Sequence, residues 1–345
     1  WKRKGGVERW RDRLIGGMRG NGYAPEFAER IFQQMLGFGE YGFPESHAFS
    51  FALLAWASSW LKRHEPEAFL AALLNSHPMG FYSPSQLIQD ATRSGIEVRA
   101  ADVSHSDWDC TLETASGTRC SVDGRPLRAV RVGLRLVGSF NKLAAERIVQ
   151  ARAQAPFADA EDLALRAALE PREMHALASA DALASLSGHR RQQIWDAAAH
   201  KRPSRLLHDA PLGEAQLCLP AAPEGEEIVF DYAALGFTLR RHPLALLRER
   251  LGRRGIQSAS DLAALRDGQR ATACGIVTVR QQPQTANGTI FVTLEDETGP
   301  VNVIVWRRVR EAQRDALLRS RLLAVRGTWQ RDEASDGRVS HLVAE

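Results

Sequence analysis

The sequence predicts a multidomain α+β protein that contains a helical N-terminal region, a tandem helix–hairpin–helix module and a C-terminal OB-fold β-barrel. Three observations support this prediction. Apolar residues recur at helical spacing up to Gly95, with a short strand expected at Ile96–Val98, short helices joined by tight turns occupy residues 134–200, and alternating strand patterns fill residues 268–345. The 345 residues are enough for two or three domains with cores of their own.

The N-terminal region, residues 1–98, is expected to be helical. Pro25 fits the first turn of a helix, where its missing N–H group costs nothing. The apolar face of this helix is expected to contain Phe27, Ile31 and Met35. Three glycines between residues 37 and 42 are expected to end the helix in a loop, and a new apolar stripe starts at Phe49.

A mixed connector is expected over residues 99–133, with a hairpin turn at Asp123-Gly124. Two helix–hairpin–helix units follow within residues 134–200. Their hairpins are expected at Val137–Asn141 and near Ser179–Leu183. Such a hairpin presents backbone N–H groups at a helix start to a DNA phosphate, and glycine permits the close approach.

The first hairpin departs from the usual pattern of two glycines around an apolar residue. Gly138 is followed by Ser139 and Asn141, and serine adopts positive φ less readily than asparagine. This departure predicts weak phosphate binding by the first hairpin. The second hairpin contains no glycine and is expected to be structural, whereas Arg190 and Arg191 are expected to contact the backbone of duplex DNA.

The C-terminal part has the clearest pattern. A linker rich in proline, alanine, glutamate and glycine is expected over residues 201–227, and a helical connector over residues 228–267. Residues 268–345 follow the order strand, strand, strand, helix, strand, strand, with an Asn287-Gly288 turn between the first two strands. This is the order of the OB-fold, a small Greek-key barrel that often binds single strands.

Charge and cysteine usage narrow the possible classes of protein. The net charge is only +4, but residues 1–20 and 301–331 are each rich in lysine and arginine, which indicates a long polyanionic partner or, alternatively, solvated helix faces. The four cysteines form no CxxC pattern, so neither a zinc site nor a disulfide framework is indicated. We find no signal peptide and no apolar stretch of about 20 residues, and we expect a cytoplasmic protein that does not engage a membrane.

Five stretches of the sequence resemble the bacterial DNA polymerase III α-subunit family, in particular its error-prone translesion branch. They are WKRKGG, GFGEYGFPESHAFSFALLAWASSWLKRHEPEAFLAALLNSHPMGFYSPSQLIQDA, DVSHSDWDCTLE, DYAALGFTLRRHPLALLR and VTLEDETGPVNVIVW. The resemblance follows the whole chain in order, and NSHPMGFYSPSQLIQDA favours the translesion branch over the replicative subunit.

The resemblance implies that the chain is the C-terminal part of such a polymerase, with the rear of the fingers in residues 1–98. The PHP domain and the palm, which carries the metal-binding aspartates, are then expected before Trp1. Glu295 and Asp296 are adjacent on a strand and point to opposite faces, so no metal site is expected in this chain.

The expected function is therefore DNA binding within an error-prone polymerase that acts in damage-induced translesion synthesis. The intact protein is expected to be a nucleotidyltransferase that uses Mg²⁺, and this chain alone is expected to be inactive. The alternative is a self-standing single-stranded-DNA-binding or adaptor protein.

In the fingers, the resemblance implies contacts with the nascent base pair and the incoming nucleotide. The residues expected near the triphosphate or the template backbone are Lys2, Arg3 and Lys4. Tyr41 is expected to place a flat face beside the base pair, and Ser46 and His47 are expected to donate hydrogen bonds to phosphate oxygens. The alternative is that Ser46 caps the following helix and His47 is a core residue.

In the barrel, aromatic and basic residues are the candidates for binding a single strand. The aromatic residues, expected either to stack bases or to fill the core, are Phe291, Trp306 and Trp329. The residues expected to contact phosphates are Arg280, Arg307, Arg308 and Arg326. Stacking on one such platform contributes roughly 1–3 kcal/mol per base.

The linker contains QLCLP, with Gln216, Leu217 and Leu219, which resembles the sliding-clamp-binding pentapeptide Gln-Leu-x-Leu-Phe. Pro220 stands in place of the aromatic anchor, so clamp binding is expected to be weak, and a coincidental linker sequence is an equal alternative. The other partners that the resemblance implies are primer–template duplex, single-stranded template in the nucleoid, and companion proteins of the translesion complex.

Overall fold

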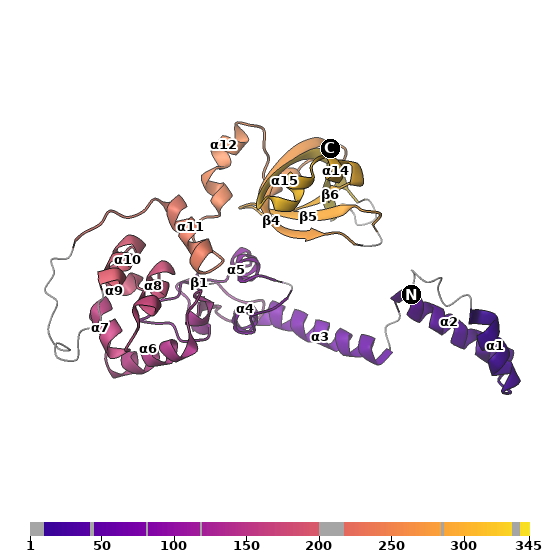
Figure 1. The fold of residues 1–345 in the computed structure, drawn as a ribbon, viewed down its shortest axis with the longest axis horizontal. Coiled ribbons are helices and arrows are strands. Elements are labelled where there is room, and N and C mark those ends of the chain that lie inside the picture. Colours follow the sequence, from indigo (N-terminus) through magenta and orange to yellow (C-terminus); the bar gives the residue numbers. More distant parts are fainter. Residues whose placement is uncertain are drawn as a thin grey trace. The chain divides into compact units, whose positions relative to one another are not determined.

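The computed structural model describes residues 10–41, 45–80, 82–117, 119–199, 217–283, 286–332 and 339–345 (Figure 1), without the side chains of residues 36–41 and 45–46. The candidates that lie outside this description are Lys2, Arg3, Lys4, Gln216 and the side chains of Tyr41 and Ser46. The chain divides into two compact units, Trp1–Leu70 with Gly117–Leu127, and Ala71–Ser116 with Arg128–Glu345. None of the described helices is long and apolar enough to cross a membrane.

The first unit is mainly helical. It contains α1 (Arg11–Gly20), α2 (Pro25–Tyr41), α3 (Glu45–His64) and the start of α4 (Pro66–Asn75). Arg11 of α1 pairs with Glu29 of α2 at 2.7 Å, and its guanidinium lies over the ring of Phe32. A small hairpin near Gly124 contributes Arg125, which pairs with Glu65 and with the fully buried Glu67 at the start of α4.

The prediction that the glycines between residues 37 and 42 end the helix in a loop is wrong in part, because α2 continues through Gly37 and Gly39 to Tyr41. A glycine costs about 1 kcal/mol relative to alanine inside a helix, which the neighbouring helical residues can offset. The buried face of α2 also differs from the expected one, because it contains Ala28 and Phe32 rather than Phe27 and Met35.

The second unit begins with the end of α4, and α5 (Pro84–Arg93) follows, where Ser83 and Gln86 form the capping box that the sequence indicates. A three-stranded sheet follows, in the order β1 (Val98–Arg99), β3 (Arg128–Arg131) and β2 (Thr111–Thr114). The helical module that follows contains η3 (Leu134–Leu136), α6 (Lys142–Gln154), α7 (Ala160–Arg166), α8 (Pro171–Ser179), α9 (Ala184–Ser187), α10 (Arg190–Ala199) and α11 (Glu224–Ala234). α11 thus starts inside the segment expected to be linker.

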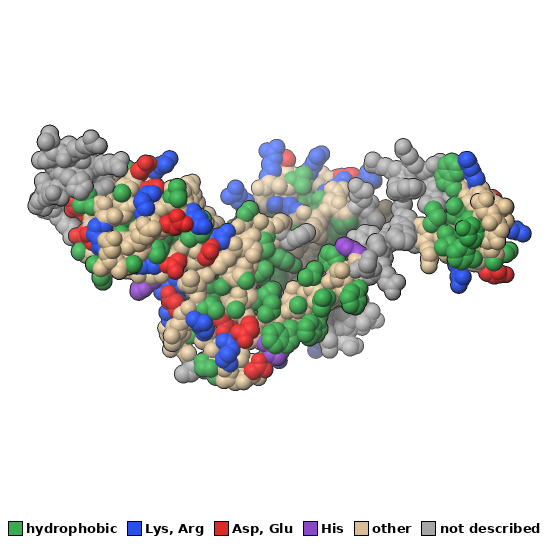
Figure 2. All heavy atoms as spheres, turned by 90° about the horizontal axis from the view of Figure 1, so that it is seen from below, with side chains coloured by type: hydrophobic (Ala, Val, Ile, Leu, Met, Phe, Trp, Pro, Cys, Tyr) green, Lys and Arg blue, Asp and Glu red, His purple; other side chains and the backbone are tan. Residues whose placement is uncertain are grey.

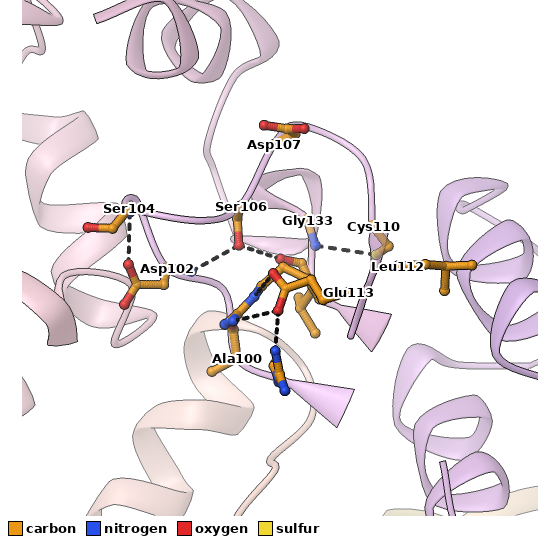
Figure 3. A network of polar contacts seen from close by, with 12 residues as sticks. Ala100, Asp102, Ser104, Ser106, Asp107, Cys110, Leu112, Glu113 and Gly133 are labelled. Atoms are coloured by element: carbon orange, nitrogen blue, oxygen red, sulfur yellow. Dashed lines mark hydrogen bonds and ion pairs between the residues drawn. The ribbon is translucent and has the colours of Figure 1, made fainter. Parts of the chain in front are cut away.

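Polar contacts hold the small sheet together (Figure 3). The Ser106 hydroxyl donates to the Val132 carbonyl at 2.7 Å and accepts from the Asp102 N–H, while the Gly133 N–H donates to the Cys110 sulfur. Arg152 of α6 donates to the carbonyls of Val103 and Ser106 and pairs with Asp107 at 2.6 Å. The sheet therefore forms one body with the first helix–hairpin–helix unit.

The C-terminal part is a closed barrel, which follows η4 (Pro243–Leu246), α12 (Arg248–Gly252) and α13 (Ala259–Ala263). Its elements are β4 (Arg270–Gln281), β5 (Ile290–Glu295), β6 (Pro300–Val305), α14 (Arg307–Ala312), α15 (Arg314–Arg319), β7 (Leu322–Arg331) and β8 (Ser340–Ala344), with the strands closing in the order β4-β5-β6-β8-β7. The predicted fold class, helical region, helix–hairpin–helix module and OB barrel, is confirmed. The helix between the third and fourth strands is divided at Gln313.

Candidate nucleic-acid interface

The outer face of β5 and β6 combines aromatic and polar side chains. Phe291 on β5 is paired with Ile304 on β6, and both point outward because their neighbours Val292, Val303 and Val305 fill the core. Phe291 is 39% exposed, and Trp306, which follows β6 directly, is 53% exposed. Thr293 and Asn302, the next outward pair, share a side-chain hydrogen bond of 3.2 Å. In OB-folds the second and third strands form the oligonucleotide face, and these are β5 and β6 here.

The loop between β4 and β5 is held beside this face by α14. Asn287 and Gly288 both adopt positive φ, 45° and 82°, as the expected two-residue turn requires. Arg310 of α14 donates to the Gly288 carbonyl at 3.0 Å, and a Cβ on Gly288 would lie 3.3 Å from the Arg310 guanidinium. The turn thus stays in a defined position next to the start of α14.

Four arginines were expected to contact phosphates, and they lie on different elements of the barrel. Arg307 and Arg308 open α14 directly after Trp306, and both are exposed, although Arg307 also pairs with Glu311 at 2.8 Å. Arg326 points outward from β7, where it is paired with Thr272 of β4, on a different side of the barrel from Phe291.

Arg280 is exposed at the end of β4 and lies beside α15. Its Nε donates to the Leu317 carbonyl at 2.7 Å, and an Nη donates to the Ser320 carbonyl. These are carbonyls at the end of α15, which have no partner within the helix. Arg280 therefore holds α15 against β4 while its side chain stays exposed, and its contact with a phosphate stays a prediction.

Trp329 fills the core rather than stacking a base. It is 4% exposed and packs in the cluster with Val325, Leu342 and Ala344. Of the three aromatic candidates, only Phe291 and Trp306 present surface to a single strand.

The acidic turn between β5 and β6 is structural. Asp296 is 2% exposed, accepts hydrogen bonds from the N–H groups of Ala259 and Gly299, and pairs with Arg248. Glu295 points elsewhere and pairs with Arg93 at 3.3 Å, and burial raises the pKa of its carboxyl. Among the residues that the structure describes, no group of three or more His, Cys, Asp or Glu side chains is arranged to hold a metal ion.

The first hairpin of the helical module has a backbone conformation that serine rarely adopts. Ser139 has a φ of 60°, and Asn141 caps α6 by accepting the Ala144 N–H at 2.8 Å. The Gly138 N–H donates to the Ala234 carbonyl of α11 at 2.8 Å, and a Cβ on Gly138 would lie 2.8 Å from that oxygen. Glycine is thus needed here for the close approach of α11, and its N–H group is not available for a phosphate.

The exposed part of this hairpin is the start of α6, which sequence reasoning missed. Lys142 is mostly exposed, and Leu143 is 70% exposed beside it. Backbone N–H groups at a helix start favour an anion, and a lysine there adds a charge. The signal in the sequence was the position of Lys142 directly after the cap at Asn141.

The second hairpin is structural, as expected. Asp181 adopts a φ of 61° and accepts hydrogen bonds from Gln193 and Arg240, while Ala182 and Leu183 are fully buried.

The expectation that Arg190 contacts DNA is wrong. Its side chain is 1% exposed, and it pairs with Glu227 at 3.0 Å and with Asp231, both on α11. A side chain so deeply buried cannot reach a phosphate. Its neighbour Arg191 is partly exposed and pairs with Glu226 at 2.8 Å.

The clamp-like segment lies along α10. The carbonyl of Leu219 accepts from His189, with 2.8 Å between the atoms, and the Leu219 N–H donates to Gln192. Leu217 is 52% exposed. The backbone of this segment is thus held at Leu219, while one apolar side chain of the motif is free at the surface.

In the N-terminal unit, His47 lies in the first turn of α3 and contacts Phe51 edge-on, with 4.4 Å between the ring centres. Because α3 begins at Glu45, Ser46 lies inside the helix rather than at its cap. The N-terminal candidates and those of the barrel belong to separate units.

Comparison with known proteins gives the following relationships. Residues 95–193 match the helix-hairpin-helix motif family, and residues 271–345 match the OB-fold nucleic acid binding domain family. All of this chain aligns with the error-prone DNA polymerases of Methylococcus capsulatus (53% identity), Alkalilimnicola ehrlichii (52%) and Bordetella parapertussis (54%). It spans 33%, 32% and 32% of those proteins, about a third of their length.

Among solved structures, asparaginyl-tRNA synthetase from Pyrococcus horikoshii matches 26% of this chain and 21% of its own, at 22% identity and a TM-score of 0.22. That likeness is too small to carry an argument.

Proposed function

Since this chain belongs, over its whole length, to the error-prone DNA polymerase family, we propose that it is the DNA-holding part of such a polymerase and acts in translesion synthesis after DNA damage. The observation that carries the proposal is the exposed face of β5 and β6, where Phe291 and Trp306 stand next to two arginines at the start of α14. Aromatic faces beside cationic side chains are the usual means of binding single strands without sequence preference.

The roles on this face follow from the geometry. Phe291 and Trp306 each offer a ring to a base. Arg308 is the stronger phosphate contact, because Arg307 shares its charge with Glu311. The turn at Gly288, fixed by Arg310, borders the face and restricts the path of the strand.

Duplex DNA would lie on the helical module. Lys142 and the free N–H groups at the start of α6 are its contact, with Ser139 beside them. The first hairpin contributes less than a two-glycine hairpin would, because the Gly138 N–H is already bound by Ala234.

Catalysis is assigned to other parts of the polymerase. Phosphoryl transfer by two metal ions needs carboxylates that are free to bind them. Asp296 and Glu295 do not fit that role, because Arg248, Arg93 and backbone N–H groups already bind them. We place the Mg²⁺ chemistry of the intact enzyme in the two thirds of its relatives' length that this chain does not span.

The remaining partners belong to the same proposal. Binding to the sliding clamp through Leu217 and Leu219 would be weak, since α10 holds the Leu219 backbone and Pro220 stands at the anchor position. We place the intact polymerase at the nucleoid in the cytoplasm, with companion proteins of the translesion complex.

Binding of a fluorescent single-stranded oligonucleotide, followed by anisotropy across a salt series, tests the barrel face. Each lost phosphate contact flattens the slope of log K against log salt by about 0.7 for a single strand. Arg307→Gln combined with Arg308→Gln should therefore flatten it by about 1.4. The matched control is Arg253→Gln directly after α12, which also removes an exposed charge but lies outside the face. Equal slopes for the double variant and the parent would refute this assignment.

A primer-extension assay with magnesium and all four nucleotides tests the assignment of catalysis to the part of the polymerase outside this chain. The chain alone should bind the primer–template without extending it. Template-dependent extension above a buffer control would overturn the assignment of catalysis to the remainder of the polymerase.

A further inference from the structure

Helix α3 is apolar in more than one direction and is exposed. Residues 48–61, which form most of it, include no charged side chain. Seven of its large hydrophobic residues are between 42% and 74% exposed: Phe49, Phe51, Leu53, Leu54, Trp56, Trp60 and Leu61. Figure 2 shows a surface on which hydrophobic side chains gather. Exposed apolar surface of this extent marks a contact site.

These side chains lie on different sides of the helix. Residues spaced by three, four or seven positions share a face of an α-helix. One stripe therefore contains Phe49, Leu53, Trp56 and Trp60. A second stripe, on another side, contains Phe51, Leu54 and Leu61. Between them runs a row of small residues, Ala48, Ala52, Ala55 and Ser59, where another helix can approach closely.

This all-round pattern identifies the kind of occupant. A helix that is hydrophobic on every side is a core helix of a larger domain. A second copy of this chain, in a two-fold dimer, would cover one face and leave the other stripe in water. The chain also spans only about a third of the length of its relatives, so the polymerase has ample further sequence to surround the helix.

We propose that α3 is the buried central helix of a domain that is completed by the part of the polymerase outside this chain. The inference rests on the proposed function, since it takes the intact error-prone polymerase as the occupant. It goes further in assigning both apolar stripes of α3 to an intramolecular interface, which would join the DNA-holding part to the remainder of the enzyme.

The test is the reactivity of introduced thiols in this chain and in the intact polymerase. Leu53→Cys and Leu54→Cys place a thiol on each of the two stripes, and Leu322→Cys on β7 is a matched control at an exposed leucine of the barrel. A maleimide reagent labels each variant, and peptide mass spectrometry separates the new thiols from the four native cysteines. Labelling depends on access to solvent, directly or through local opening.

In the chain alone, all three thiols should react at similar rates. In the intact polymerase, the thiols at positions 53 and 54 should both react at least about tenfold more slowly, while the thiol at 322 keeps its rate. Unchanged rates at 53 and 54, or protection at only one of them, would overturn the inference. Protection that appears in the chain alone and grows with its concentration would also overturn it, in favour of self-association.

The two proposals can fail separately. A polymerase that extends primers but leaves both thiols reactive would remove the inference and keep the proposed function. A longer protein in which both thiols are protected, but which neither binds nor extends DNA, would remove the proposed function and keep the packing of α3.

Discussion

Replacement of Arg190 by methionine is the sharpest test of how α10 and α11 are held together. The Arg190 side chain is 1% exposed and contacts three groups on α11: the Glu227 carboxylate at 3.0 Å, the Glu227 carbonyl at 2.8 Å and the Asp231 carboxylate. Arg240 also reaches Asp231, at 2.9 Å, and Glu227, at 3.2 Å. Methionine fills much of the same volume, so the main effect of Arg190→Met is to leave buried acids with one cation instead of two.

The size of this effect follows from the burial. Removing one partner of a buried ion pair costs about 3–5 kcal/mol. We expect the lower end, about 3 kcal/mol, because Arg240 still compensates both carboxylates. Hydrogen exchange in peptides from α10 and α11 should therefore accelerate by about 150-fold, while peptides from the barrel strands keep their rates. The neighbouring control, Arg191→Met, breaks a partly exposed pair, which is worth about 0–1 kcal/mol, so its exchange should change by less than about fivefold.

A double variant separates charge from packing. If the loss comes from the acid left without its cation, Arg190→Met with Glu227→Gln should be more stable than the sum of the two single effects predicts, by about 0.5–3 kcal/mol. The reasoning would be refuted if Arg190→Met left the exchange of α10 and α11 unchanged and instead weakened DNA binding. That result would return Arg190 to the DNA contacts that the sequence indicated.

Three further predictions follow from the barrel and from shifted carboxylates. Trp329→Ala should destabilise the barrel by about 3–5 kcal/mol in thermal unfolding, whereas Trp306→Ala should leave stability nearly unchanged and weaken single-strand binding about 5- to 150-fold in anisotropy titrations. Arg131 and Arg99 lower the pKa of Glu113 to about 2. The stability that Glu113 contributes is therefore complete above the ordinary carboxylate pKa and is lost as pH falls towards 2. Glu113→Gln should remove this part of the acid sensitivity in an acid titration followed by circular dichroism. Burial raises the pKa of Glu227, so the folded protein holds this proton more tightly than the unfolded chain does, and stability declines as pH rises through the raised pKa. Glu227→Gln should flatten that decline when unfolding is measured across a pH series. An unchanged slope of stability against pH would contradict this assignment to Glu227.

Local signals in the sequence were sufficient where one or two residues decide the conformation. Asn287 and Gly288 tolerate positive φ, so the turn between the first two barrel strands could be placed from the dipeptide alone. Ser83 with Gln86 satisfies the free N–H groups at a helix start, and that cap is also present. The order of the barrel strands followed from such turns and from the alternation between them.

The burial of Arg190 could not be predicted from such local signals. Its partners Glu227 and Asp231 are 37 and 41 positions away in the sequence, on a helix that starts inside the segment expected to be linker. Nothing near Arg190 in the sequence distinguishes it from Arg191, although one is in the interior and the other is at the surface. The difference arises from where α11 packs, which is a tertiary event. The same event explains why Gly138, expected to admit a phosphate, admits the Ala234 carbonyl instead.

The burial of Trp329, by contrast, could have been predicted from the sequence. Arg326 and Trp329 are three residues apart on one strand, and side chains alternate between the two faces of a strand. In a closed barrel one face is the core, so the two residues cannot both contact DNA. Arginine is much more costly to bury than tryptophan, which assigns Arg326 to the outside and Trp329 to the core. The burial of Val325 and Trp329, with Arg326 exposed, follows that alternation. The same rule applied to β5 and β6 puts Phe291 and Ile304 outside together, and this pairing makes Phe291 the best candidate within the strands for stacking a base.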